Sequence, residues 1–330
     1  MSVTPAPEVT VVIPTRDRRQ LLSTRALPSA LGQQEVSLEV VVVDDGSTDD
    51  TVEHLEALGD PRVSVIRQRR ARGPSAARNA GIAAARTEWV AFLDDDDLWS
   101  PRKLRTQLQA ASANGAGWAF SRAVVVNEHG TIVASPALAE PEGLAATLLT
   151  GNRIWGGDSN VIAKTTLLHE LGGFDERLQC FEDWDLWIRL AQSSPAAACP
   201  EVLVATLEHP DRMLFRFHPD VIDQLETMLV KHRAVTREDR LGVVEWLAGE
   251  HAQVGRRFAA SRLYLRAALT YRSPGNLAPA VGVVFGDRGL RLAARLHLAL
   301  RGRTHLRVSP AEGNDVTNVP WLAGGGAASA

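Results

Sequence analysis

Four consecutive carboxylates, Asp94 to Asp97, follow an apolar run of the sequence. One carboxylate is enough to cap a helix, such as the one that Ser100-Pro101 would begin, and acidic residues favour the positive end of a helix dipole. Four are different, because a like charge within about 4–6 Å disfavours ionisation. A divalent cation removes that repulsion, and hard oxygen ligands suit Mg²⁺ or Mn²⁺. The segment therefore predicts a metal site, with capping as the alternative.

Polar residues also follow two other apolar runs. Pro14 and Thr15 end the first of these runs, and Asp44 and Asp45 end the second. The alternative for Asp44–Ser47 is ordinary turn and N-cap chemistry, for which Asp and Ser are well suited. These residues are therefore candidates for binding as well as for local structure.

A third candidate segment, residues 73–81, consists mainly of Gly and Ala but contains Arg78 and Asn79. Small residues allow a close backbone approach, and an arginine on the opening turn of a helix suits an anionic group. The alternative is an alanine-rich packing helix, which explains every residue here except Arg78 and Asn79.

The apolar runs are expected to be the strands that position these residues. β-branched and apolar residues predict strands at 9–14, 38–43, 63–67 and 88–93, with helices between them at 17–31, 47–58 and 74–86. Such alternation predicts βαβ units and a buried parallel sheet. Sheets of this kind bind ligands at the carboxyl ends of their strands, where the candidate residues lie.

The pattern changes after residue 117. A hairpin is predicted from runs at 117–126 and 131–135 that flank Asn127–Gly130, so antiparallel strands join the sheet. The remaining predicted elements are helices at 164–171 and 183–192, a strand at 202–207, and helices at 221–230, 240–252, 256–270 and 288–300. We therefore predict a first domain at 1–220, a basic helical region at 221–308 and a disordered tail at 309–330.

The composition is that of an ordinary soluble globular protein. The chain has 330 residues, of which 45% are apolar and 23% charged. No apolar run reaches the 18 or more residues of a spanning helix, and the first residues lack a basic stretch before an apolar core. Two cysteines cannot form a disulfide framework. We therefore expect a protein of the reducing cytoplasm.

Five motifs occur in one order along the first 190 residues. They are Val-Val-Ile-Pro-Thr (11–15), Val-Val-Asp-Asp-Gly-Ser-Thr-Asp (42–49), Gly-x-x-x-Ala-Arg-Asn-x-Gly (73–81), Phe-Leu-Asp-x-Asp-Asp (92–97) and Phe-Glu-Asp-Trp-Asp-Leu-Trp-x-Arg-Leu (181–190). This series resembles the family 2 glycosyltransferases of the GT-A fold, over roughly residues 9–207. The resemblance implies an α/β fold with a Rossmann-like, mixed but mostly parallel sheet flanked by helices, here with a C-terminal helical appendage.

The resemblance also implies a nucleotide-sugar donor and residues that bind it. Those residues would be Pro14, Thr15, Asp44, Asp45, Arg78, Asn79, Asp94 and Asp95. Thr15 and Asp44 would hold the base, and a carboxylate accepting from a ring N–H is suitable for that. A divalent metal, Mn²⁺ or Mg²⁺, would be held by Asp96 and completed by His209, with His218 as a nearby competitor. The metal would stabilise the charge of the departing nucleoside diphosphate.

In the same family the Glu-Asp motif supplies the base, which here would be Asp183, with Glu182 orienting it or the acceptor. The alternative is an amphipathic helix that buries Trp184 and Trp187 and has Asp183 as its N-cap. Direct displacement by an activated hydroxyl inverts the anomeric centre, so an inverting hexosyltransferase is implied. The acceptor would be a sugar, a lipid-linked molecule or a small molecule. Trp155 could form a sugar-stacking platform, or it could belong to the core.

Some features depart from the family pattern. Relatives commonly have an aromatic residue and Asn where this chain has Arg16 and Asp17, positions that bear on base or donor preference. The Gln-x-x-Arg-Trp signature of processive synthases is missing, which predicts transfer of a single sugar. Two alternatives remain, a sugar nucleotidyltransferase and a degenerate protein that only binds a nucleotide sugar. The first normally needs a Gly-rich phosphate loop, and residues 14–19 contain no glycine.

Positive charge is concentrated near the C-terminus. Residues 251–308 contain eleven Arg, no Lys and one acidic residue, although the whole chain has a net charge of −3. One interpretation is a solvated helical cap. The other is docking on an anionic membrane surface, which would suit a lipid-linked acceptor. Nucleic acid is excluded as a partner because the aromatic residues form no stacking series.

Overall fold

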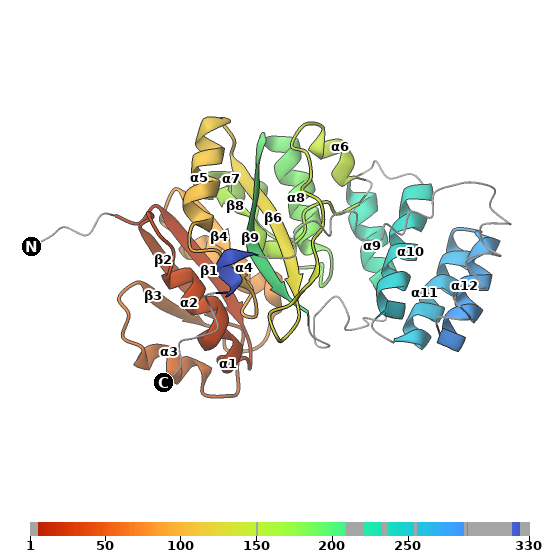
Figure 1. Cartoon of the computed structure of the whole chain (residues 1–330), viewed down its shortest axis with the longest axis horizontal. Helices are drawn as coiled ribbons and strands as arrows, with labels where there is room; N and C mark the ends of the chain where they lie inside the picture. The colour runs from red at the N-terminus through yellow and green to blue at the C-terminus, as the bar shows by residue number, and fades with distance from the viewer. Residues whose placement is uncertain are drawn as a thin grey trace, which may run out of the picture. The chain divides into compact units, whose positions relative to one another are not determined.

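The computed structural model describes residues 6–149, 151–208, 221–232, 237–253, 256–286, 289 and 319–323 (Figure 1). They belong to two compact units. The sheet unit contains residues up to 148, residues 152–208 and the described C-terminal segment 319–323, and the helical unit contains 149–151 and the described residues between 209 and 310. The sheet unit thus contains described residues up to Glu208 and again at 319–323. The predicted boundary at residue 220 lies outside the described residues.

The first half of the sheet is parallel, as predicted. Its strands are β1 (Val9–Thr15), β2 (Leu38–Asp44), β3 (Val63–Arg67) and β4 (Trp89–Phe92). Strand β1 pairs in parallel with both β2 and β4, and β2 pairs with β3. The residues of β1 and β2 are almost all buried, which explains their continuous β-branched sequence. The register sets Thr15 opposite Asp44, so the carboxyl ends of these two strands are level.

The second half of the sheet combines short antiparallel pairs with one long parallel pair, between β6 and β9. Its strands are β5 (Leu98–Trp99), β6 (Trp118–Val126), β7 (Ile132–Ala134), β8 (Ile162–Lys164) and β9 (Ala196–Leu207). The predicted hairpin is confirmed, because β6 and β7 pair antiparallel across Asn127–Gly130. Strand β8 joins β4 to β6, and the sheet order is β3-β2-β1-β4-β8-β6-β9-β5. The sequence did not predict β5 and β8, because two or three residues are too few to display alternation.

Helices cover the sheet. In the sheet unit they are α1 (Arg19–Leu21), the π-helix η1 (Leu22–Ala26), α2 (Leu27–Leu31), α3 (Thr51–Ala57), α4 (Pro74–Ala84), α5 (Lys103–Ala113), α6 (Leu144–Leu148), η2 (Gly157–Asn160), α7 (Thr165–Leu171) and α8 (Glu182–Ser193). Helix α4 packs on β1 and β2, and α5 packs on β6 and β9. A Cβ atom at Gly81 of α4 would collide with Val12 of β1, so this helix needs glycine to approach the sheet. The mixed sheet with flanking helices confirms the predicted fold class.

The predicted amphipathic character of α8 is confirmed. Trp184 and Trp187 are buried, and Trp187 stacks on Trp118 of β6 with ring centroids 6.3 Å apart. Aromatic burial of this kind supplies much of the packing energy of a core. The first turn of α8, which carries Glu182 and Asp183, is thereby fixed against the sheet.

The helical unit contains the predicted helices within its described residues. They are α9 (Val221–Lys231), α10 (Arg237–Gln253) and α11 (Arg257–Thr270), followed by η4 (Pro274–Asn276), α12 (Leu277–Gly282) and η5 (Val283–Phe285). Asn276 donates to Glu245 at 2.8 Å, which ties η4 to α10. The helix expected at 288–300 lies outside the described residues except for residue 289. In the described part of the chain, no helix combines the length and the apolar character that a membrane crossing requires.

Five residues of the predicted disordered tail are ordered. Val319 and α14 (Pro320–Ala323) pack against Val124, Val126 and Ala205 of β6 and β9. The indole N–H of Trp321 donates to the carbonyl of Val202 at 2.9 Å. The prediction of disorder was therefore wrong for residues 319–323, because it considered the Gly-rich end and not the apolar residues before it.

Lys103 at the start of α5 is fully buried. Its Nζ lies 4.0 Å from the centroid of the Trp99 ring and has no hydrogen-bond partner among the described residues. Burial lowers the pKa of Lys103 well below its usual value, and the charge of nearby Cys199 offsets this only in part. Folding at neutral pH therefore tends to remove a proton that the unfolded chain holds.

We predict that Lys103→Met raises the free energy of unfolding by about 1–3 kcal/mol at pH 7, because no polar group is then buried unpaired. The unfolded lysine binds the proton more strongly, so the stability of the wild type should rise with pH towards about 10. The stabilisation of Lys103→Met relative to the wild type should therefore shrink as pH rises. Urea denaturation at pH 7 and pH 9.5 measures both effects. Lys164→Met is the control, because Lys164 is half-exposed beside Trp89. An equal gain in both variants, or none at Lys103, would contradict the prediction.

Candidate functional site

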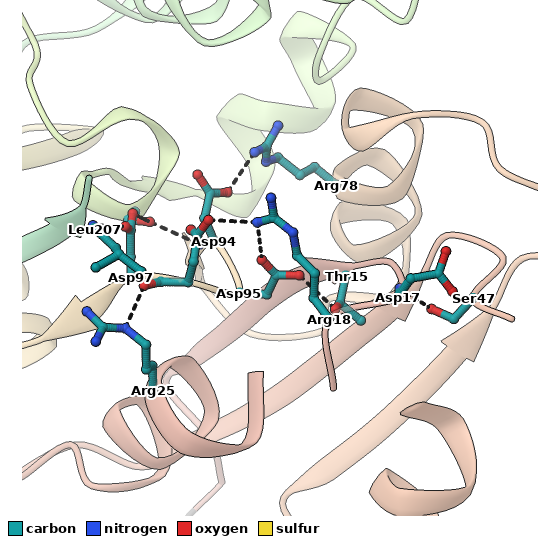
Figure 2. Close-up of polar contacts among 12 residues, drawn as sticks. Thr15, Asp17, Arg18, Arg25, Ser47, Arg78, Asp94, Asp95, Asp97 and Leu207 are labelled. Atoms are coloured by element: carbon teal, nitrogen blue, oxygen red, sulfur yellow. Dashed lines mark hydrogen bonds and ion pairs between the residues drawn. The ribbon is translucent and has the colours of Figure 1, made fainter. Parts of the chain in front are cut away.

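The candidate residues meet at the carboxyl end of the parallel strands (Figure 2). Thr15 ends β1, Asp44 ends β2, and Asp94–Asp97 follow β4. The backbone N–H of Asp45 donates to the carbonyl of Thr15 at 2.9 Å, and Thr15 Oγ1 donates to Asp95 Oδ2 at 2.8 Å. The structure therefore brings three of the five motifs into direct contact. Pro14 lies within β1, one residue before this edge.

Asp44 and Asp45 are engaged with loop backbone. Asp44 is fully buried and accepts from the N–H of Ser47 at 3.1 Å. Asp45 accepts from the N–H groups of Arg72 and Gly73 at 2.7 and 2.9 Å. The turn alternative is thus correct for Asp44, whereas Asp45 binds the backbone of a loop distant in the sequence. The two carboxylates order the loops that border the edge. Helix α3 begins at Thr51 with Asp50 at its N-cap position, so Ser47 does not cap it.

The four carboxylates after β4 point to different partners. Asp94 pairs with Arg78 at 2.7 Å, whereas Arg18 lies 3.1 Å from Asp95 and 2.7 Å from Asp96. Figure 2 shows both guanidinium groups directed at this segment. Two arginines therefore relieve part of the repulsion that the sequence predicted. The sequence analysis missed Arg18, because its contacts with Asp95 and Asp96 are 77 and 78 positions away in the chain.

Asp97 has a structural role. Its carboxylate accepts from Ser159 Oγ at 2.6 Å and from the N–H of Leu207 at 3.1 Å. It is buried and ties the end of β4 to the end of β9. The run of four acids thus contains one that holds strands together and three that border the site.

Asp95 is the most buried of the three site carboxylates. Burial, and next the charge of Asp96, raise the pKa of Asp95 to about 7, against the opposing effect of Arg18. Asp94 and Asp96 are more open, with side chains 35% and 14% exposed. Ligands entering from solvent would therefore meet Asp94 and Asp96 first.

Among the described residues, no group of three or more His, Cys, Asp or Glu side chains is arranged to hold a metal. Asp96 offers oxygen ligands of the type that Mg²⁺ and Mn²⁺ prefer, and Mg²⁺ is commonly held by one or two carboxylates together with phosphate oxygens. The donor set therefore fits a metal that a diphosphate helps to hold. The predicted ligand His209, and its competitor His218, lie outside the described residues.

Arg78 is the centre of a second cluster. Its Nη2 lies 2.7 Å from Asp94 and 2.8 Å from Asp158, and its Nη1 lies 3.3 Å from Glu182. Burial alone would lower the pKa of Arg78, but the three carboxylates raise it. One guanidinium therefore joins the end of β4 to the start of α8.

The side chain of Asn79, the neighbour of Arg78, contacts the 174–176 loop and not the Arg78 cluster. Its side chain donates to the carbonyl of Phe174 at 2.9 Å and accepts from the N–H of the same residue at 2.8 Å. It also donates to Glu176 at 3.1 Å. The structure thus does not bring Asn79 together with Asp94–Asp97, because both ends of its amide hold the 174–176 loop.

Asp158 in η2 belongs to the cluster, although the sequence analysis did not single it out. It is 4% exposed, and its Oδ1 has no hydrogen-bond partner among the described residues. Burial raises the pKa of Asp158 well above its usual range, more than Arg78 lowers it. Two glycines of positive φ, Gly156 and Gly157, turn the chain to bring it there. The Gly-Gly-Asp pattern was the available signal.

Trp155 precedes this turn. Its side chain is 43% exposed, so the alternative that it belongs to the core was wrong. Its carbonyl accepts from Asn160 at 2.6 Å. The ring is therefore available on the surface next to η2.

Glu182 and Asp183 form the first turn of α8. The helix starts at Glu182 after Phe181, which has a φ of 65°, so Asp183 is not the N-cap. Asp183 accepts from the N–H of Trp184 at 2.6 Å and from Asn152 at 3.4 Å, and its side chain is partly exposed. Burial raises the pKa of Asp183, although the Trp184 N–H opposes this. Burial also raises the pKa of Glu182, to about 7, against the effect of Arg78.

The cluster is short of positive charge. Asp94, Asp158, Glu182 and Asp183 surround one guanidinium. The raised pKa values follow from this imbalance in a buried environment. Such a site either holds a proton near neutral pH or accepts a further cation. Groups that exchange a proton near neutral pH are suited to acid–base catalysis.

Comparison with known proteins agrees with the resemblance found in the motifs. Residues 10–138 match the family model described as glycosyl transferase family 2. The succinoglycan biosynthesis protein ExoO of Rhizobium meliloti is 37% identical over 190 residues, which cover 54% of each chain. The Escherichia coli protein WfgD, named as a UDP-Glc:α-D-GlcNAc-diphosphoundecaprenol β-1,3-glucosyltransferase, is 25% identical over 190 residues, covering 58% of this chain and 72% of WfgD. The match spans about half the length of ExoO.

The fold has solved counterparts. A crystal structure of Staphylococcus aureus TarS residues 1–349 in complex with UDP has a TM-score of 0.56 with 17% identity, covering 90% of this chain and 93% of TarS 1–349. At this identity the likeness concerns the fold. It agrees with the predicted GT-A class.

We predict that Glu182→Gln removes a fall in stability between about pH 4.5 and pH 7. Folded Glu182 keeps its proton up to a pKa of about 7, whereas the unfolded chain loses it near 4.5. The folded state therefore binds more protons in this window, and wild-type stability declines as pH rises, by up to about 3 kcal/mol from this group. Denaturant unfolding across the window measures the slope. Glu88→Gln, at a side chain 69% exposed, should leave the slope unchanged; the same slope in wild type and Glu182→Gln would refute the assignment.

Proposed function

We propose that this chain, whose residues 10–138 are of the family 2 glycosyltransferase type, moves a single sugar from a nucleoside-diphosphate sugar to an acceptor hydroxyl with inversion. One observation carries this proposal. Arg78 pairs with Asp94 on the donor side at 2.7 Å and with Glu182 on the other side at 3.3 Å. Arg78 therefore links the predicted donor edge to Glu182, the residue next to the predicted base Asp183, whose pKa it also lowers.

In this proposal Asp183 is the general base. The acceptor O–H gives its proton to the Asp183 carboxylate, its oxygen forms a bond to the anomeric carbon, and the bond from that carbon to the diphosphate breaks. Burial raises the pKa of Asp183, which makes its carboxylate a better proton acceptor than an exposed one. Its contacts with Trp184 and Asn152 hold it in place. Attack from the face opposite the leaving group inverts the configuration.

The donor would lie along the ends of β1, β2 and β4. We assign base recognition to Thr15 and Asp44, and ribose or diphosphate contacts to Arg78, Asp94 and Asp95. The assignment includes Pro14 and Asp45 as residues that border the donor, whereas Asn79, which holds the 174–176 loop, would act on the donor only through that loop. The relatives' names favour uridine, since TarS is in complex with UDP and WfgD uses UDP-Glc. We therefore propose a UDP-sugar as donor.

A divalent metal, Mn²⁺ or Mg²⁺, would be held by Asp96 with the diphosphate oxygens, and His209 remains a proposed further ligand. When bound, it would act as a Lewis acid that stabilises charge on the leaving diphosphate. Arg18 and Arg78 border the same region and add positive charge to it. Residues of the chain therefore supply much of the electrostatic environment themselves.

Two other functions remain to be separated from this one. A sugar nucleotidyltransferase would release pyrophosphate from a nucleoside triphosphate and a sugar phosphate, whereas the proposed enzyme releases UDP. A degenerate binding protein would release neither. A screen of nucleotide sugars with candidate sugar and lipid-linked acceptors, followed by product analysis, distinguishes the three.

We predict that Asp183→Asn lowers kcat at least 100-fold, because a general base contributes about 10²–10⁴-fold, while the affinity for the donor is retained. UDP release measures kcat, and calorimetry measures donor binding. Asp60→Asn is a control at the opposite end of β3, where Asp60 pairs with Arg62. A Asp183→Asn protein that keeps more than about a tenth of wild-type kcat would reject Asp183 as the base.

The helical unit is proposed to contact an anionic membrane surface. Its α11 exposes Phe258, Leu265 and Leu269 at spacings of one helix face, and α12 with η5 exposes Leu277, Val281 and Phe285 four residues apart. Phe258 and Phe285 are 76% and 74% exposed. Such exposed apolar side chains in an Arg-rich segment are typical of interfacial helices. We call these six residues the apolar face.

This contact would bring the enzyme to a lipid-linked acceptor. The WfgD name contains a diphosphoundecaprenol acceptor, which favours an acceptor of the same kind here. Basic residues near an anionic surface contribute about 1 kcal/mol each. We therefore propose that the protein works in the cytoplasm at the inner face of the membrane.

We predict that Phe258→Ser with Phe285→Ser weakens binding to vesicles of phosphatidylglycerol and phosphatidylcholine at least tenfold, because two aromatic anchors are lost from the apolar face. Vesicle co-sedimentation of the full chain measures this. Leu58→Ser with Val133→Ser changes two half-exposed apolar residues of the sheet unit and should have no effect. Equal binding of wild type and the double Phe variant would contradict membrane docking.

A further inference from the structure

Arg18 forms a partly buried ion pair with two carboxylates of the Asp94–Asp97 run. Its Nη1 lies 2.7 Å from Asp96 Oδ2 and 3.1 Å from Asp95 Oδ1. The Arg18 side chain is 25% exposed, and those of Asp95 and Asp96 are 7% and 14% exposed. Screening by water is therefore weaker than at the surface, and the contacts are charge-assisted hydrogen bonds of good length.

The loop before α1 holds Arg18 in this position. Its neighbour Asp17 has a φ of 52°, which is unusual for a residue other than glycine. Asp17 keeps this conformation because its N–H donates to Ser47 at 2.9 Å and its Oδ1 accepts from the N–H of Thr48 at 2.7 Å. The β2 loop thus fixes the backbone from which Arg18 reaches across to the end of β4 (Figure 2).

Arg18 and a divalent metal compete for the same group. Asp96 is the carboxylate proposed to hold the metal, and in the structure it is paired with Arg18. A guanidinium at 2.7 Å neutralises the carboxylate and repels a second cation that approaches it. A nucleoside diphosphate brings further negative charge, which can attract both cations at once.

We propose that Arg18 is a positioning residue that keeps Asp96 from binding a divalent metal until the nucleoside diphosphate is present. This inference rests on the proposed function. Arg18 holds Asp96 in the free protein and turns to the diphosphate when the donor enters, which releases Asp96 Oδ2 from this ion pair. Metal and nucleotide then bind cooperatively, and the coupling between them is reciprocal.

The test is Mn²⁺ binding to the full chain by isothermal calorimetry, with and without UDP. Wild type should bind Mn²⁺ at least tenfold more weakly without UDP than with it. Arg18→Gln, and Arg18→Met as a second variant that keeps an unbranched side chain, should bind Mn²⁺ alone at least tenfold more tightly than wild type. Arg19→Gln is the matched control, because Arg19 is 45% exposed and pairs with Asp50 at 3.1 Å, and it should match wild type.

Two results would overturn the inference. If UDP promotes Mn²⁺ binding in wild type but neither Arg18 variant binds Mn²⁺ alone more tightly, the metal remains and the competition by Arg18 is rejected. If no protein binds Mn²⁺ with or without UDP, the metal itself is rejected, and the inference with it. Transfer activity measured separately tells whether the glycosyltransferase proposal survives either result.

Discussion

The buried guanidinium of Arg78 is the interaction on which the site depends. It joins Asp94, Asp158 and Glu182, which come from the end of β4, from η2 and from the start of α8. Removing one partner of such a buried pair leaves an uncompensated charge. Separating any of the three segments would therefore cost free energy, and the ion pairs hold the segments together. Phe174 packs at 5.4 Å from the guanidinium and shields one of its sides. The approach of α8 to the sheet is therefore electrostatic as well as hydrophobic.

The sheet explains why these charges gather at one end. Parallel pairing sets Thr15 at the end of β1 opposite Asp44 at the end of β2. Strand β4 ends at Phe92, opposite Val12, so the residues that follow it continue beside the last residues of β1 and share a small volume with them. The chain relieves the resulting repulsion with two arginines of different exposure. Arg78 is almost fully buried and fixed, whereas Arg18 keeps a quarter of its side chain in solvent. The first is suited to holding structure and the second to moving when a charged ligand arrives.

The sequence predicted the parts that obey local rules. Strands β1 to β4, the hairpin and the buried face of α8 have periodicities that a single segment carries. No role was predicted for Asp158 and Arg18, because their partners lie far away in the chain and only the folded sheet brings them together. Asn79 is the opposite case. Its motif predicted a contact with the nucleotide sugar, but its amide binds the backbone of Phe174. The sequence therefore indicated which loops form the site more reliably than which way each side chain points.

Trp321 and its neighbours belong to the sheet unit, although they follow the helical unit in the sequence. Because α14 packs on β6 and β9, the sheet unit is built from both sides of the helical unit in the sequence. The predicted helical appendage is thus followed in the sequence by a segment that belongs to the sheet unit. Shortening the chain from its C-terminus would remove Trp321 and uncover Val124, Val126 and Ala205 before it reached the apolar face. Only an internal deletion that rejoins the flanking segments could separate the role of the helices from the integrity of the sheet.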